Sequence, residues 1–115
     1  MPPDEIENIK SSIHLNNHVL TETEFNQRNS KNARELRKKG KRLVKRKAYQ
    51  EAIHMYTKGL SLAGLRNKDR TFLLSNRSQA RIFILKNENL PEDEITVNIN
   101  SAYEDAQNLI STEPT

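Results

Sequence analysis

The spacing of small and apolar residues between positions 33 and 60 constrains this chain more than any other feature. Such residues recur there at steps of three and four, which is the period of helices buried along one side. The connection Arg46-Lys47-Ala48 interrupts the recurrence, and its shortness favours two antiparallel helices. The segment therefore predicts one helical hairpin. The recurring positions are Leu36, Gly40, Leu43, Tyr49, Ala52, Tyr56 and Gly59.

These positions resemble the pattern of the tetratricopeptide repeat, a helical hairpin of about 34 residues that stacks into solenoids. The Leu-Leu-Ser-Asn-Arg-Ser stretch at 73–78 resembles the start of a second repeat in cochaperone-type members of that family. Residues 101–114 resemble its second helix, with Ala102, Ala106 and Leu109 on one side and Pro114 as terminator. The resemblance implies an all-α fold of antiparallel helical hairpins, stacked as a short tetratricopeptide-type solenoid. We expect helices near residues 31–46, 49–64, 68–87 and 100–111.

Two parts of the chain are expected. Residues 1–32 form a polar N-terminal arm or a short helix, with a weak apolar stripe of Ile6, Ile9 and Ile13. Residues 33–115 form the two hairpins, with an insertion at about 87–100 that adds roughly fifteen residues to the family period. The insertion is a long loop or a helix extension at an interaction edge, or a neutral addition of the kind surface loops tolerate.

Residue usage argues against catalysis and cofactor binding. The chain has no Cys, which excludes disulfides, thiolate metal sites and a Cys nucleophile. Its three glycines fall at helix-packing or helix-end positions and not in a phosphate-binding loop. His14 and His18 lie four residues apart but lack the Glu of a zinc-binding His-Glu-x-x-His helix, so we interpret them as surface residues. We therefore expect a protein that is not an enzyme and has no metal or cofactor.

Other composition features bear on location. No apolar run reaches about 18 residues and no secretory h-region follows Met1, so we expect a cytoplasmic or nuclear protein without a membrane span.

The carboxylates Glu92, Asp93 and Glu94 follow Pro91, an order that suits the start of a helix better than an acid–base pair.

The run RKKGKRLVKRK, from Arg37 to Lys47, supports several functional hypotheses. In a chain with a net charge of +4, this run could attract nucleic acid, an importin-type receptor or an acidic peptide, or it could be a solvated helix face. Nucleic acid is disfavoured because no aromatic residue interleaves with the charges to stack on bases.

Position favours the acidic peptide. In the cochaperone-type branch, a carboxylate clamp binds the C-terminal Glu-Glu-Val-Asp tail of cytosolic heat-shock chaperones. The resemblance places Arg37 at the first basic position of this clamp, Lys41 where Asn is usual, and Asn76 at the second Asn position. The two remaining basic positions belong to a third repeat.

The sequence thus predicts a non-catalytic interaction module, or adaptor, whose groove residues Arg37, Lys41 and Asn76 bind acidic peptide segments such as chaperone tails. An alternative is an accessory repeat segment of a larger enzyme, such as a SET/MYND methyltransferase. Either capping or self-association is also expected. A short solenoid leaves its last apolar face open, and either the N-terminal arm or a second copy would cover the face around Leu109 and Ile110.

Overall fold

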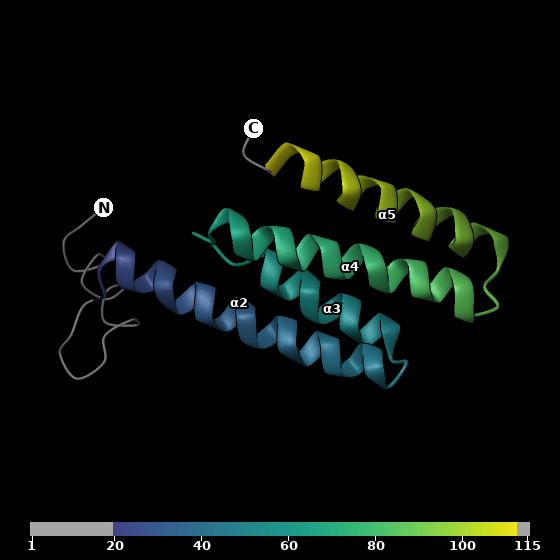
Figure 1. The fold of residues 1–115 in the computed structure, drawn as a ribbon, viewed down its shortest axis with the longest axis horizontal. Coiled ribbons are helices and arrows are strands. Elements are labelled where there is room, and N and C mark those ends of the chain that lie inside the picture. The colour runs from purple at the N-terminus through teal and green to yellow at the C-terminus, as the bar shows by residue number, and fades with distance from the viewer. Residues whose placement is uncertain (1–19, 113–115) are drawn as a thin grey trace, which may run out of the picture.

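Four consecutive helices make up residues 20–112, the part of the chain that the computed structural model describes (Figure 1). Successive helices run antiparallel, and no strand occurs within this range, so the predicted all-α fold is confirmed. No helix in the same range is both long and apolar enough to cross a membrane. The helices are α2 (Glu22–Lys45), α3 (Tyr49–Leu60), α4 (Asn67–Asn87) and α5 (Glu92–Thr112).

Helix α2 begins at Glu22, well before the start expected near residue 31. Thr21 caps this end, because its backbone is extended and its Oγ1 accepts a hydrogen bond from the backbone N–H of Glu24 at 3.1 Å. Thr21 and Glu24 have the Thr-x-x-Glu spacing of a capping box. Residues 22–32, expected as part of a polar arm or a short helix, therefore belong to the long helix α2. Residues 1–19, which include His14 and His18, lie outside the described residues, as does Pro114.

The turn from α2 to α3 ends the first helix with two backbone hydrogen bonds. The N–H of Lys47 donates to the carbonyl of Val44, and the N–H of Ala48 donates to that of Leu43, each at 2.9 Å. This pair of bonds requires a left-handed residue between helix and loop, and Lys47 supplies it with φ of 63°. Glycine is usual there because a Cβ strains this conformation. The predicted short connection is confirmed, with Lys47 in a strained backbone conformation.

Helices α2 and α3 approach closely at Gly40. A Cβ added to Gly40 would lie only 2.7 Å from Cζ and 2.9 Å from Cδ1 of the Tyr56 ring, so no larger residue fits without movement. Ala52 of α3 is fully buried as well. The buried cluster around this contact consists of Ala33, Ala52, Tyr56, Leu73 and Ala80.

The N-terminal half of α2 contacts the connection between α3 and α4. Gly64 adopts a φ of 71°, and a Cβ there would overlap the side chain of Asn26. One helical turn further on, Nδ2 of Asn29 donates a hydrogen bond of 2.9 Å to the carbonyl oxygen of Ala63. These contacts explain why a polar segment forms a long helix: its amide side chains meet partners on the neighbouring loop. Helix α3 ends at Leu60, before the expected residue 64, and turns lead into α4.

The start of α5 shows whether the predicted insertion at 87–100 is a loop or part of a helix. A connection of residues 88–91 follows α4, and α5 then runs unbroken from Glu92, so the helix extension is the alternative that the structure favours. Glu92 and its two acidic neighbours occupy the first turn, as expected, where carboxylates favour the helix dipole. Among the helices described, α5 packs on α4 alone (Figure 1). Ala102 and Leu109 are half-buried against it, whereas Ala106 is exposed, contrary to its predicted position on the packed side.

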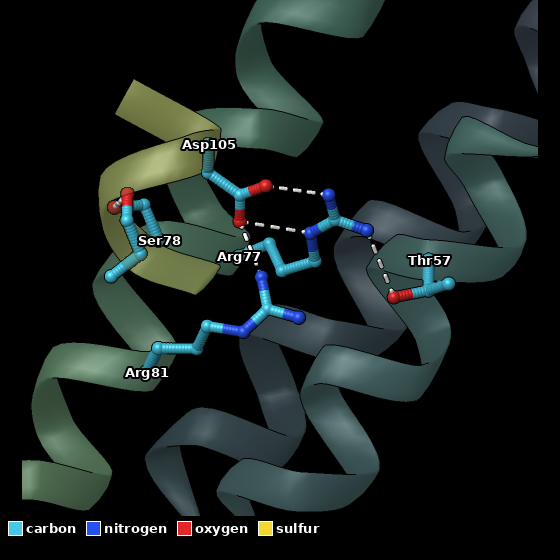
Figure 2. A network of polar contacts seen from close by, with 6 residues as sticks. Thr57, Arg77, Ser78, Arg81 and Asp105 are labelled. Atoms are coloured by element: carbon cyan, nitrogen blue, oxygen red, sulfur yellow. Dashed lines mark hydrogen bonds and ion pairs between the residues drawn. The ribbon is translucent and has the colours of Figure 1, made fainter. Parts of the chain in front are cut away.

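A buried carboxylate joins α5 to α4 (Figure 2). Asp105 is 2% exposed and is the buried residue of α5 within positions 92–110. Arg77 of α4 donates to both of its oxygens, from Nη2 to Oδ1 at 2.6 Å and from Nε to Oδ2 at 2.9 Å. Arg81, one turn along α4, donates from Nη1 to Oδ2 at 2.5 Å. Two cations on one helix thus share one carboxylate on the next.

The same network reaches α3. Nη1 of Arg77 donates to Oγ1 of Thr57 at 3.1 Å, so a single guanidinium contacts both neighbouring helices (Figure 2). Burial lowers the pKa of Arg81 from its ordinary value, and Asp105 partly offsets this effect while Arg77 adds to it. The network therefore pairs buried charges with directed hydrogen bonds, and it fixes the position of α5 relative to the first hairpin.

Candidate functional site

Two neighbouring depressions lie between α2 and α4. Side chains one helical turn apart on α2 face side chains one helical turn apart on α4. Nη1 of Arg34 lies 3.8 Å from Oδ2 of Asp69, and one turn further the guanidinium carbon of Arg37 lies 4.5 Å from the ring centre of Phe72. Lys41 of α2 then lies in one depression with residues of α4. We call this surface the α2–α4 groove.

One end of the groove has an apolar floor and a cationic wall. This depression, of about 190 Å³, is floored by Tyr56 and Ala80, and Phe83 closes its end. The ring of Phe83 stacks on that of Tyr49 with their centres 5.7 Å apart. Ammonium groups and amides therefore face each other across an apolar surface, an arrangement suited to a peptide with both acidic and apolar side chains. The wall residues are Lys41, Val44 and Lys45 on α2 and Asn76 and Gln79 on α4.

The other end of the groove is strongly basic. Four cations and one carboxylate line a depression of about 370 Å³ around the half-exposed ring of Phe72. Arg37 and Lys68 both approach this ring, at 4.5 Å and 5.9 Å from its centre. Cation–π contacts of exposed groups contribute about 0.5–1 kcal/mol each and hold the cations beside the groove. The depression is lined by Arg34, Arg37, Arg66, Lys68, Asp69 and Phe72.

Asp69 is the acidic exception in this basic end. It is 7% exposed, and its Oδ2 lies 3.8 Å from both Nη1 of Arg34 and Nε of Arg66. That oxygen accepts no hydrogen bond from the described residues, although it is buried. Asp69 lies in the first turn of α4, where the helix dipole favours a carboxylate. It neutralises part of the local charge and leaves the remaining cations available to a ligand.

Tyr56 lies below the groove with its phenol shielded from water. Burial raises the pKa of Tyr56 above its ordinary value of 10.0, and the positive charge of Arg37 partly offsets that rise. The hydroxyl therefore stays protonated at neutral pH and adds no negative charge to the groove.

The structure brings two of the three predicted site residues together. Lys41 and Asn76 line the same depression, whereas Arg37 lines the neighbouring basic one and stacks on Phe72. Sequence reasoning missed Phe72 as part of the groove. Phe72 precedes Asn76 by one helical turn, and that spacing places both on one side of α4. His54, the one histidine among the described residues, is exposed on α3, in agreement with a surface role.

The geometry defines a class: an all-helical protein of two antiparallel hairpins, with a basic groove between the first helices of the two hairpins. Comparison with protein-family models, with curated proteins and with solved structures finds no match to this chain. The function is therefore argued from the groove itself.

Proposed function

We propose that the chain is a non-catalytic adaptor of the tetratricopeptide type, whose α2–α4 groove binds an extended acidic peptide segment. One observation carries this proposal: cations of α2 face amides of α4 across an apolar floor in one depression and lie beside the Phe72 ring in the neighbouring one. The order of helix packing supports the repeat interpretation, because α3 packs against α4 and α2 also contacts α4. Stacked hairpins of a solenoid have this arrangement, in which the first helices line one face.

Each part of the groove suits a different part of such a peptide. Arg37 and Lys41 present positive charge to carboxylates, and charge-assisted hydrogen bonds contribute about 1.5–3 kcal/mol each when desolvated. The amide of Asn76 can donate to a peptide carbonyl or carboxylate. The apolar floor above Tyr56 accepts one aliphatic or aromatic side chain. The Glu-Glu-Val-Asp tail of heat-shock chaperones combines acidic groups with one apolar residue, so it is the first peptide to test.

Peptide titration monitored by fluorescence anisotropy tests the proposal. The ligand is a labelled Glu-Glu-Val-Asp-terminated peptide, with a free or an amidated C-terminus. We expect Arg37→Ala/Lys41→Ala to weaken binding at least about tenfold, which is the loss of about 1.4 kcal/mol, and added salt to weaken binding further. Lys31→Ala/Lys58→Ala is the matched control, since it removes two exposed cations outside the groove.

The outcomes separate three cases. Weaker binding by the groove variant but not by the control supports the groove. Equal binding by the two variants and the unmodified chain excludes it. Equal binding of free and amidated peptides, with the groove variant still weaker, would show that the groove selects acidic side chains and not a terminal carboxylate.

A further inference from the structure

Helix α5 exposes a row of large apolar side chains on one side. Ile95, Ile99, Tyr103 and Ile110 recur at helical steps, and they are 37%, 50%, 66% and 71% exposed. The neighbouring side of α5 contacts α4 through Asp105 and half-buried residues. A continuous apolar row of this kind marks a surface that another protein segment covers. We call it the α5 row.

Helix α2 lies at the other end of the stack from α5 (Figure 1). Phe25 is 39% exposed and Leu36 is half-buried on one side of the helix, where Leu43 packs inward against the core cluster. This side lies roughly a third of a turn away from Arg37 and Lys41, so it is separate from the peptide groove. We call it the α2 outer side. It offers a partly apolar surface on a helix of similar length to α5.

Charge indicates which segment covers the α5 row. Helix α2 carries nine Lys and Arg residues against three carboxylates, whereas α5 carries five carboxylates and neither Lys nor Arg. A second α5 would bring like charges together. The first nineteen residues contain Asp4, Glu5 and Glu7 but a single basic residue, Lys10, so they also have the same sign as α5. A basic helix is the complementary occupant, and the chain itself contains one.

We infer that the α5 row of one copy packs against the α2 outer side of a second copy, head to tail. Both surfaces are present on every copy, and their helices, α5 and α2, do not contact each other and lie at opposite ends of the stack (Figure 1). The contact is therefore heterologous: a bound copy still offers one free surface at each end, and assembly extends with concentration. The exposed α5 carboxylates face the α2 cations, and high salt weakens the contact.

Sedimentation velocity of the full chain tests this inference with two blocked variants. Ile99→Lys/Tyr103→Lys places cations on the exposed α5 row, and Lys39→Glu/Arg42→Glu places carboxylates beside the α2 outer side. Lys58→Glu/Lys86→Glu is the control for the α2 variant, with the same charge change placed on α3 and α4. Circular dichroism verifies that each variant is folded.

We expect the mean mass of the unmodified chain and of the control to rise past the dimer with concentration. Raising salt from about 0.05 M to 0.5 M should weaken the association roughly tenfold. Each blocked variant alone should stay monomeric. An equimolar mixture of the two should form a dimer and nothing longer, because one intact α5 row meets one intact α2 outer side.

Three results would overturn the inference. The first is a monomer at concentrations up to about 1 mM, where even a contact of about 4 kcal/mol is half formed. The second is a closed dimer unaffected by Lys39→Glu/Arg42→Glu, which would indicate pairing of two α5 helices. The third is assembly that occurs only after residues 1–19 are removed, which would show that this segment covers the α5 row.

Discussion

Replacing Asp105 with Asn should destabilise the fold more than any other single change in its network. The carboxylate accepts three hydrogen bonds from two guanidiniums and is 2% exposed. Removing one partner of a buried ion pair costs about 3–5 kcal/mol, because the remaining charge is left without compensation. Arg77 and Arg81 retain side-chain exposures of 17% and 16%, so some water reaches them. We therefore expect a loss of about 3 kcal/mol, a large share of the 5–15 kcal/mol typical of a domain.

The two arginines should not contribute equally. Arg77 still donates to both oxygens of Asp105 when Arg81 is absent, and burial disfavours the charged form of Arg81, as its lowered pKa indicates. Arg81→Met should cost about 1 kcal/mol or less, since it removes one bond together with a desolvated charge. Arg77→Met removes two bonds to Asp105 and one to Thr57, so it should cost about 2 kcal/mol.

Urea unfolding followed by far-ultraviolet circular dichroism measures these differences. The expected order of destabilisation is Asp105→Asn, then Arg77→Met, then Arg81→Met. The combined variant Asp105→Asn/Arg77→Met/Arg81→Met should recover part of the loss caused by Asp105→Asn, because no guanidinium is then left unpaired. A loss below about 1 kcal/mol for Asp105→Asn, or equal losses for all three single variants, would contradict the view that the carboxylate organises the network.

Three further predictions concern the first hairpin. Gly40→Ala should destabilise the fold by about 1–3 kcal/mol in urea unfolding, because the new methyl group clashes with the buried Tyr56 ring. The cost of this clash should exceed the gain in helix propensity. A stabilised variant would contradict the packing described. Lys47→Gly should raise the unfolding free energy by about 0.5–1 kcal/mol, since glycine adopts a φ of 63° without Cβ strain. Lys45→Gly is the control: it lies within α2, so it should lower the unfolding free energy. The free energy of unfolding should fall as pH rises above 10.0, because Tyr56 ionises in the unfolded chain before it ionises in the folded one. Tyr56→Phe should reduce that fall in urea titrations at alkaline pH. An unchanged pH profile would argue against a raised Tyr56 pKa.

The first hairpin could be predicted from the sequence because its spacing determines its burial. Of the seven positions that the period selects, Leu36 and Leu43 are half-buried, and the other five are buried: Gly40, Tyr49, Ala52, Tyr56 and Gly59. A recurrence of small and large residues at helical steps leaves one way for two short-linked helices to pack. The α2 start was placed too late because its N-terminal half is polar, and its burial depends on the amide of Asn29 meeting a loop distant in sequence.

The candidate site could be predicted only in part, for a related reason. Lys41 and Asn76 were placed on facing helices from their positions within the repeat pattern, and the structure brings them into one depression. The orientation of Arg37 depends on Phe72, a contact between helices whose offset no local pattern reveals. The pairing of Asp105 with Arg77 and Arg81 was missed for the same reason. A charged residue on a helix is usually exposed, and only the offset of α5 along α4 makes this one buried.

The single neighbour of α5 has a consequence for motion within the folded chain. Helix α4 contacts every other described helix, whereas α5 contacts α4 only. Separating α5 therefore breaks one interface and leaves the cluster of Tyr56, Leu73 and Ala80 intact. Backbone amides of α5 should open to solvent through a partial unfolding that costs less than unfolding the whole chain, and exchange their hydrogens sooner than those of α3 or α4. The last helix is thus the part of the stack that we expect to separate first.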